Sequence, residues 1–292
     1  MAQEIPEAQE ASGPSVSVVL VAFHQLEALR RSIAALERSQ DREHLEILVL
    51  DCGSQDGTAE IDSEFPSVSV LRLPHHLGAT KAMNIGVRTA KAELVFFLSP
   101  NVEVLPGTLS QLIARLEQDT DAAAVCPLLT DPSGQPAPGV FRYPSRESFA
   151  SGALTPMDLD LTQESIPVEY PGRNALLVRK QFIRTVNYFD EHFGEYWSDA
   201  DLAVKVRRTG KKIRLYPSIR AVLHPAEDPL EGDALAEADR TLGAAQYIGK
   251  YNGFFAGASF RLSAVLSALF RFNFRRFSLL LSGQKLDGTQ TG

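Results

Sequence analysis

Short apolar runs alternate with amphipathic stretches along the first half of the chain. The runs span residues 16–23, 45–50, 68–73, 94–98 and 122–129, and each ends at a polar or glycine-containing turn. Continuous apolar runs of this length are typical of strands that are buried on both faces of a sheet. Between them, apolar residues recur every three or four positions, which predicts helices. The alternation predicts an α/β fold with a mostly parallel sheet flanked by helices.

The apolar run at 94–98 stops abruptly at Ser99-Pro100-Asn101. In an open α/β sheet, ligands bind outside the carboxyl ends of the strands. Ser99, Asn101 and Glu103 are therefore expected to lie beside a ligand. Ser and Asn are unusual at such a position, since a divalent cation prefers carboxylate ligands.

Regular patterning disappears between residues 130 and 172, where Pro, Gly, Ser and Asp dominate. A loop of this length in a compact domain is usually functional or mobile. Patterning then resumes and predicts a strand at 174–179, a helix that opens at Ser198 and closes before Gly210, and two short strands at 213–216 and 219–223.

The C-terminal part of the chain, from Glu231, is helical in pattern and rich in Ala. Residues 251–270 carry a single charge, Arg261, over about the length of a membrane span. The charge in mid-span and two glycines argue against a true span. Two other interpretations stay open: an interfacial amphipathic helix near anionic lipid, and a helix packed on the domain with a solvated basic face.

The net charge of -7 over 292 residues argues against a nucleic-acid-binding protein, which is normally basic. The charge is uneven, because the segment from Lys250 onward holds six Lys/Arg and one Asp, about +5 against about -12 elsewhere. Cys52 and Cys126 have neither metal nor disulfide spacing and are expected to be buried free thiols of a reducing compartment. Residues 1–14 show no signal-peptide pattern and predict a disordered tail. A cytoplasmic protein is expected.

Several motifs together resemble family 2 glycosyltransferases of the GT-A fold, and the bacterial rhamnosyltransferase-like branch in particular. The resemblance is collinear from about Val16 to His224, which makes it more specific than any one motif. Its motifs are Val19-Leu20-Val21-Ala22-Phe23-His24, Asp51-Cys52-Gly53-Ser54-Gln55-Asp56-Gly57-Thr58, Leu77-Gly78 with Asn84-Ile85-Gly86, Phe97-Leu98-Ser99-Pro100-Asn101 and Tyr196-Trp197-Ser198-Asp199-Ala200-Asp201-Leu202.

The resemblance implies a nucleotide-diphosphate-sugar site at the ends of the strands. Asp51 stands where the family contacts the base and ribose, and Asp56 matches the rest of that loop or, alternatively, caps a helix. Lys81 and Asn84 are the nearest counterparts of an Arg-Asn pair near the donor, although a surface Lys on a helix is also ordinary. The full set expected to bind the donor is Ala22, Phe23, Asp51, Gly53, Asp56, Lys81, Asn84, Ser99 and Asn101.

The resemblance also implies a divalent cation, Mg²⁺ or Mn²⁺, but the motif that should bind it is altered. The family has Asp-X-Asp, or Asn-Pro-Asp in the rhamnosyltransferase branch, where this chain has Ser99-Pro100-Asn101. An amide oxygen can still bind such an ion, but more weakly than a carboxylate. Asn101 is the expected ligand, with Glu103 and His224 as further ones. Glu103 has a second interpretation as a solvent-facing strand-end residue, and His224 as a structural histidine.

The second diagnostic motif of the family is Glu-Asp, whose Asp is the general base, and here it reads Ser198-Asp199. Inverting glycosyl transfer needs a carboxylate that removes the proton of the acceptor hydroxyl. Asp199 is the predicted base. Ser198 is predicted as a helix N-cap with Asp201 completing a near capping box. Trp197, which could also be core, and Arg173 are assigned to the acceptor side.

These observations predict an inverting glycosyltransferase that uses a dTDP-rhamnose-like or UDP-sugar donor. Its acceptor is expected to be a glycan or a lipid-linked molecule of cell-surface polysaccharide synthesis, reached at the inner face of the cell membrane. Two alternatives are metal-free catalysis, with Lys81 or Arg173 compensating the leaving group, and a non-catalytic protein that binds nucleotide-sugar or glycan. The predicted parts are a tail (1–14), a transferase domain (15–228) with an acceptor-side loop (130–172), and a helical, basic, membrane-associating extension (229–292).

Overall fold

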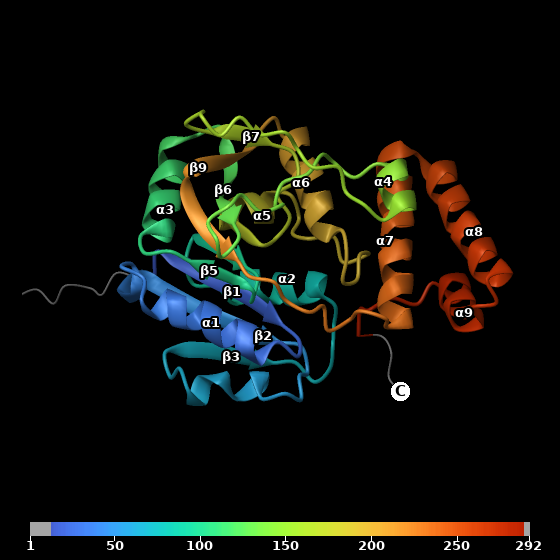
Figure 1. Ribbon diagram of the computed structural model, residues 1–292, viewed down its shortest axis with the longest axis horizontal. Coiled ribbons are helices and arrows are strands. Elements are labelled where there is room, and N and C mark those ends of the chain that lie inside the picture. The colour runs from blue at the N-terminus through green and yellow to red at the C-terminus, as the bar shows by residue number, and fades with distance from the viewer. Residues whose placement is uncertain (1–12, 289–292) are drawn as a thin grey trace, which may run out of the picture.

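Within residues 13–288, which the computed structural model describes, nine strands form one mixed sheet (Figure 1). The first four strands along the chain pair in parallel, with β1 between β2 and β4. Across the sheet the order is β3 (Val68–Arg72), β2 (Leu45–Asp51), β1 (Val16–Ala22), β4 (Leu94–Leu98), β8 (Ala175–Arg179), β6 (Ala122–Thr130), β9 (Lys212–Leu223) and β5 (Val102–Val104), with β7 (Ile166–Val168) paired to β9.

The α/β prediction is confirmed, and the five apolar runs of the first half each form a strand. The sheet is less parallel than the alternation of elements indicates, because β8 runs antiparallel to both β4 and β6. The two short strands predicted at 213–216 and 219–223 are one strand, β9. Its register with β6 shifts between Tyr216 and Arg220, so the chain bulges at Pro217 without turning away from the sheet.

Helices cover both faces of the sheet and give it two hydrophobic cores. The apolar stripe of each helix, such as Leu29, Ile33 and Leu36, is fully buried against the strands. One face is covered by α1 (Leu26–Glu37) and α3 (Thr108–Gln118), and the other by α2 (Ala79–Thr89), α5 (Lys180–Thr185) and α6 (Ser198–Arg208).

The predicted C-terminal helical extension is present and lies at one end of the molecule (Figure 1). It consists of α7 (Ala234–Asn252), α8 (Phe254–Phe270) and α9 (Phe274–Ser282), with α4 (Arg146–Ser151) from the long loop beside α7. Helices α7 and α8 approach closely where Gly257 faces Gly249, since a Cβ at Gly257 would lie 2.7 Å from the Gly249 Cα. Among residues 13–288, no helix combines the length and apolar character that a membrane span requires. Of the tail predicted at 1–14, only residues 13 and 14 lie within the described part of the chain.

Candidate active site

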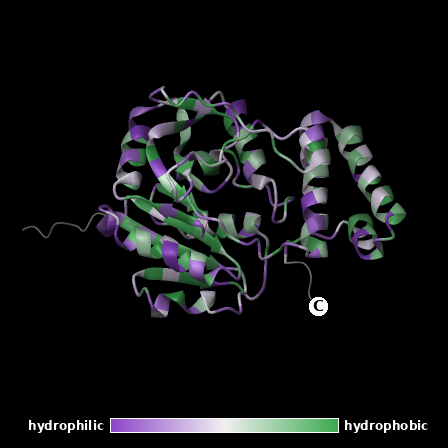
Figure 2. Ribbon diagram, in the orientation of Figure 1, coloured by the Kyte–Doolittle hydropathy of each residue, from purple (hydrophilic) through white to green (hydrophobic). Residues whose placement is uncertain are grey.

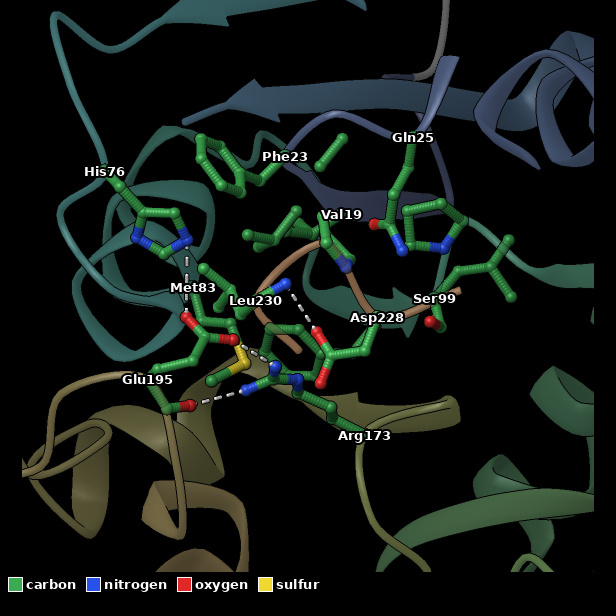
Figure 3. A pocket seen from close by; sticks show the side chains of 16 residues that line it. Val19, Phe23, Gln25, His76, Met83, Ser99, Arg173, Glu195, Asp228 and Leu230 are labelled. Carbon is green, nitrogen blue, oxygen red and sulfur yellow. Dashed lines mark hydrogen bonds and ion pairs between the residues drawn. The ribbon is translucent and has the colours of Figure 1, made fainter. Parts of the chain in front are cut away.

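A cavity of about 140 Å³ lies at the carboxyl ends of β1 and β4. Phe23 and Ser99 line it from these strand ends, and Met83 lines it from α2 (Figure 3). The segment 228–230 lines the cavity as well, and there the Asp228 carboxylate accepts a hydrogen bond from the Leu230 backbone N–H at 2.9 Å. The strand ends therefore form a pocket where the sequence predicts a ligand.

Three charged or polar side chains meet at the edge of this cavity (Figure 3). Arg173 donates to the Glu195 carboxylate at 2.7 Å and to the Glu195 backbone carbonyl at 3.0 Å. The other carboxylate oxygen of Glu195 accepts from the Ala79 backbone N–H at 2.6 Å and lies 3.7 Å from His76 Nε2. Glu195 is buried, so this network fixes a cation and an imidazole beside the cavity.

Burial and the charges in this network determine which of its groups are protonated at neutral pH. Burial disfavours the charged form of Arg173, but the carboxylates of Glu195 and Asp199 outweigh it and raise the pKa of Arg173. Burial lowers the pKa of His76 below 6.5, and the positive charge of Arg173 adds to this effect against the opposing Glu195. At neutral pH the site therefore presents a permanent guanidinium cation and a neutral imidazole.

The predicted base, Asp199, lies in the first turn of α6 and is partly exposed. One carboxylate oxygen accepts from the Tyr170 hydroxyl at 2.9 Å, and the other accepts from the Ala200 backbone N–H at 2.9 Å. Burial raises the pKa of Tyr170 well above 10, and the neighbouring Asp199 charge raises it further. Tyr170 therefore remains a protonated donor and orients the Asp199 carboxylate.

The predicted metal ligands contact one another through hydrogen bonds. Ser99 donates its hydroxyl to the Asn101 amide oxygen at 2.7 Å, while the Asn101 amide nitrogen donates to the His224 carbonyl at 3.1 Å. His224 Nε2 lies 2.9 Å from a Glu103 carboxylate oxygen. Across residues 13–288, no cluster of three or more His, Cys, Asp or Glu side chains is arranged to hold a metal ion. This donor set does not fit a divalent cation.

The strand-end loops after β1 and β2 are tied together, which brings Ala22, Phe23, Asp51 and Gly53 to one edge. Ala22 and Asp51 are partners in the parallel register, and the buried Asp51 carboxylate accepts from the Ser54 backbone N–H at 3.1 Å. Gly53 has φ +79°, and a Cβ there would lie 2.8 Å from the His75 Cα, so only glycine suits this approach.

Asp56 serves the alternative role that the sequence leaves open, since it caps local structure. Its carboxylate accepts from the Leu26 backbone N–H at 3.0 Å, at the start of α1, and from the Thr58 backbone N–H at 3.1 Å. Burial tends to raise the pKa of Asp56, but these hydrogen bonds outweigh it and lower the pKa.

Two expected donor-side residues lie away from the strand-end cavity and line a different one. The amide of Asn84 is buried and clamps the loop after α5, with hydrogen bonds to the Phe189 backbone and to Glu191. Lys81 Nζ donates to the Asp287 carbonyl at 2.5 Å. The C-terminal segment therefore covers the Lys81 ammonium group.

The start of α6 differs from the prediction, because Trp197, with φ +76°, is its N-cap residue and has no side-chain capping bond. The predicted capping box of Ser198 and Asp201 is wrong. Both side chains are buried: the Ser198 hydroxyl accepts from Thr80 Oγ1 at 2.8 Å, and the Asp201 carboxylate accepts from the Tyr251 hydroxyl at 2.6 Å. Tertiary partners from α2 and α7 replace the local cap.

Trp197 and Tyr196 line a second cavity of about 690 Å³, between α4, α7 and α8. The Trp197 indole N–H donates to the Arg240 carbonyl at 2.9 Å, and its ring meets Phe149 edge to face at 4.9 Å. Trp197, one of the two residues assigned to the acceptor side, therefore lies at this second cavity and two residues before Asp199 in the chain. Arg173, the other residue, lies at the strand-end cavity.

The sequence analysis gives no role to three residues of this site, His76, Glu195 and Tyr170. Glu195 immediately precedes the Tyr196–Leu202 motif, and His76 lies in the loop after β3. Tyr170 lies within the loop at 130–172, and its backbone pairs with Phe141. Their partners are far away in the chain, so no local spacing indicates them.

Comparisons with known proteins identify the family of the chain. Residues 17–172, more than half of the chain, match the family described as Glycosyl transferase family 2. The N-acetylglucosaminyl-diphospho-decaprenol L-rhamnosyltransferase of Mycobacterium tuberculosis is 27% identical over 233 residues, which cover 72% of this chain and 76% of that protein. The O-antigen biosynthesis protein RfbC of Myxococcus xanthus is 22% identical over 253 residues, 80% of this chain and 19% of that protein.

Among solved structures, the crystal structure of GalNAc-T7 with UDP, GalNAc and Mn²⁺ is similar, with a TM-score of 0.65 at 17% identity. The match covers 80% of this chain and 47% of that chain, so this chain spans about half the length of its solved relative. At this identity the likeness concerns the fold, and it confirms the predicted GT-A fold.

Proposed function

The chain belongs to glycosyl transferase family 2 and is a glycosyltransferase, and from this we propose that it inverts the anomeric carbon of a nucleotide-diphosphate sugar during transfer. The proposed donor is a dTDP-rhamnose-like or UDP-sugar, and the proposed acceptor is a hydroxyl of a glycan or a lipid-linked molecule in cell-surface polysaccharide synthesis. The names of the rhamnosyltransferase and O-antigen relatives support this substrate class.

The observation that carries the proposal is the partly exposed Asp199 carboxylate, held by the buried Tyr170 hydroxyl near Arg173. Asp199 takes the proton of the acceptor hydroxyl, and the acceptor oxygen forms a bond to the anomeric carbon. The bond from that carbon to the diphosphate oxygen breaks, and the diphosphate leaves with the electron pair. Arg173, at the strand-end cavity, offsets the negative charge that develops there.

The donor is proposed to lie across the strand ends, with its base towards Asp51 and its diphosphate towards Ser99 and Arg173. A cavity of about 140 Å³ is small beside ligand pockets of about 300–1,000 Å³. Because residues 228–230 line its wall, donor entry requires this segment to move outward. The acceptor-side loop at 130–172 contributes Tyr170, which supports its proposed place beside the base.

A divalent cation has no step in the proposed reaction. The solved relative contains Mn²⁺, but in this chain Asn101 is hydrogen-bonded to Ser99 and His224, and Glu103 contacts His224. Asn101 is a neutral amide, and the one carboxylate of the set, Glu103, already contacts His224 and Arg38. Such a set is a poor match for a hard cation. Arg173 is therefore proposed to neutralise the leaving group without a metal.

For localisation, we propose peripheral association with the inner face of the cell membrane, where a lipid-linked acceptor is available. In this arrangement residues 15–228 form the transferase domain and residues 229–292 form the extension that faces the membrane. The alternative of a non-catalytic binding protein is not favoured, because the chain's relatives are named as glycosyltransferases.

The test measures nucleotide-diphosphate release with a panel of dTDP-, UDP- and GDP-sugars, for the wild type and for Asp199→Asn. The variant keeps its shape and loses its basicity, so turnover is expected to fall by at least about 100-fold with an unchanged Tm. The matched control is Asp121→Asn, which changes an exposed carboxylate that does not line the cavity. Unchanged turnover in Asp199→Asn would contradict the base assignment, and no release by the wild type with any donor would favour the binding protein.

A further inference from the structure

The connection between α8 and α9 exposes three aromatic rings to solvent. Phe270, Phe272 and Phe274 are 77%, 78% and 63% exposed. These three residues, here named the aromatic corner, lie at the outer end of the helical extension (Figure 1). Burying a ring of this size stabilises a folded protein by about 1.5–3 kcal/mol. Three neighbouring rings in water therefore indicate a surface that is covered when the protein works.

Phe272 ends α8 in a strained backbone conformation. It has φ +55°, in the left-handed region that Gly or Asn normally occupies, and a bulky residue there costs about 1–3 kcal/mol. This conformation lets the backbone N–H groups of Phe272 and Asn273 donate to the Leu269 and Ala268 carbonyls, both at 3.0 Å, which closes the helix. Glycine would serve this cap without strain, so the cap itself does not require the exposed Phe272 ring.

An exposed apolar stripe runs along α8 into the aromatic corner. Phe255, Leu262 and Leu266 are 86%, 58% and 43% exposed, and their spacing of seven and four residues places them on the face that ends at Phe270. The opposite face of α8 packs on α7 through Val265 and Ala268. Figure 2 shows apolar and weakly polar colours along most of α8. A surface helix normally has a polar outer face, and α8 does not.

The charges beside the aromatic corner are all positive. Arg271 and Arg275 are exposed, and neither makes an ion pair with any residue of the 13–288 range. Arg261 instead donates to the Leu280 carbonyl and fastens α9 to α8. In sequence, no Asp or Glu occurs between residues 240 and 286. Arg276, by contrast, lies 3.5 Å from Glu237 of α7. The surface at Arg271 and Arg275 is therefore apolar and cationic.

We propose that the aromatic corner and the α8 stripe insert into the interface of an anionic lipid bilayer, with Arg271 and Arg275 on the lipid phosphates. Apolar rings beside cations match the boundary between acyl chains and anionic headgroups. A second copy of this chain fits poorly, because a two-fold contact through this surface would oppose Arg271 and Arg275 to the same residues of the partner, and Glu237 is already paired with Arg276.

Two adjoining cavities lead from this surface towards Trp197. A cavity of about 430 Å³ opens at Arg271 and Asn273. It shares Phe149, Phe260 and Arg276 with the cavity that Trp197 lines, two residues before the proposed base. Docking at the aromatic corner would therefore bring a lipid-linked acceptor to the cavity beside Trp197. This consequence and the choice of the membrane as partner deepen the proposed function and rest on it, whereas vesicle binding is measured without catalysis.

Flotation with vesicles tests the surface itself. The full chain is mixed with phosphatidylcholine vesicles that contain no or about one third phosphatidylglycerol, and is expected to float only with the anionic ones. Each arginine near an anionic surface contributes about fivefold, so Arg271→Gln/Arg275→Gln should lose roughly 25-fold in binding and Phe270→Ser/Phe274→Ser more. Arg184→Gln, another exposed arginine on α5, is the control.

Phe272→Gly separates a lipid role from a structural one. It relieves the left-handed strain, so the Tm should stay or rise while vesicle binding falls. Equal binding of wild type and corner variants, or a concentration-dependent dimer that Phe270→Ser abolishes, would overturn the proposal. Donor hydrolysis in solution is measured in parallel. Hydrolysis without vesicle binding would contradict the docking surface alone, and vesicle binding without hydrolysis would support it while contradicting the proposed function.

Discussion

Tyr170 holds Asp199 from a position that solvent does not reach. Its hydroxyl is the one side-chain donor to the Asp199 carboxylate among residues 13–288. Replacing it with Phe keeps the buried ring and leaves no buried group unpaired, since Asp199 is partly exposed. Asp199 then loses its orientation towards the acceptor.

We expect Tyr170→Phe to lower kcat by about 10- to 100-fold, the worth of a hydrogen bond to a charged group. Steady-state kinetics with the preferred donor would measure this, and differential scanning calorimetry should give a nearly unchanged Tm. Tyr143→Phe, which removes another tyrosine hydroxyl from the same loop, is the comparison. A fall in kcat as large as that of Asp199→Asn would mean that Tyr170 does more than orient the base.

At this scale the sequence identifies residues by type and order, and it misses those that depend on distant partners. Asp51 could be placed at the end of a strand and Asp199 at the start of a helix because their motifs adjoin predicted elements. Glu195 could not, since its role comes from Arg173 and from the Ala79 backbone N–H. Asn84 matches the motif, but its amide bonds to the Phe189 backbone, a contact over 105 residues that no pattern reveals.

The Asp239 carboxyl group links helix α7 to the chain segment at Glu195 and Tyr196. Asp239 is fully buried and accepts hydrogen bonds from the backbone N–H groups of Glu195, at 2.8 Å, and Tyr196, at 3.3 Å. Burial raises the pKa of Asp239 from 3.8 to about 7, against the effect of these hydrogen bonds. Between pH 4 and 7 the folded protein therefore holds a proton that the unfolded chain has released.

This difference makes Asp239 a source of pH-dependent stability. Because the folded state binds more protons, its contribution to the free energy of unfolding is greatest below pH 4 and declines as pH rises to 7. Urea unfolding at pH 5 and pH 7.5 should show that the wild type loses about 2 kcal/mol more than Asp239→Asn over this interval. Equal pH dependence of the two proteins would contradict the assignment.

The C-terminal segment lies against α2 and the loop before it. The Gly288 carbonyl is 3.1 Å from His75 Nε2, and the Asp287 carbonyl accepts from Lys81. Gly288 has φ +74°, and a Cβ there would lie 2.4 Å from the Leu77 Cδ2. A larger residue at position 288 is therefore strained in its backbone and must displace the Leu77 side chain.

We expect Gly288→Val to lower the Tm by more than Gly210→Val does. Both glycines have a left-handed backbone, with φ +74° and +78°, so a valine is strained at either position. Of the two, position 288 is the one where the new Cβ also meets neighbours, Leu77 and His75, so the extra loss measures the contacts of the C-terminal segment. Thermal unfolding compares the two variants, and equal losses of Tm would show that these contacts contribute nothing to stability.

Elements with their own periodicity were predictable, and those that depend on pairing were not. The strand predicted at 94–98 has the observed bounds of β4, and the helix predicted between the first two apolar runs is α1. The strand β5 was missed because it has only three residues, Val102–Val104, and exists through its pairing with β9. The direction of β8 could not be predicted from the sequence either, since an apolar run fits a parallel or an antiparallel neighbour.

The whole molecule places its three chemical features along one path. The strand-end cavity borders Arg173 and Glu195, Asp199 follows in the same loop-to-helix segment, and the groove beside Trp197 continues to Arg271. The first two features depend on the sheet and the last depends on the helical extension. Under the proposed function, the donor and the acceptor therefore approach Asp199 from different parts of the fold.

The donor's diphosphate is proposed to meet a fixed guanidinium rather than a metal ion, so nucleotide binding should be independent of Mn²⁺. A ligand at about 100 times its Kd stabilises the folded state by about 2.7 kcal/mol, a shift of several degrees in Tm for a chain of this size. Thermal unfolding is measured with UDP, dTDP and GDP, each with Mn²⁺ or with chelator, and one nucleotide should give the same shift in both.

Arg173→Gln should abolish the shift, whereas Asn101→Asp, which adds a carboxylate at the strand end, should make it rise with Mn²⁺. A wild-type shift that requires Mn²⁺ would mean that Asn101 and His224 release their mutual hydrogen bonds to bind the ion, and Arg173 would lose its proposed role.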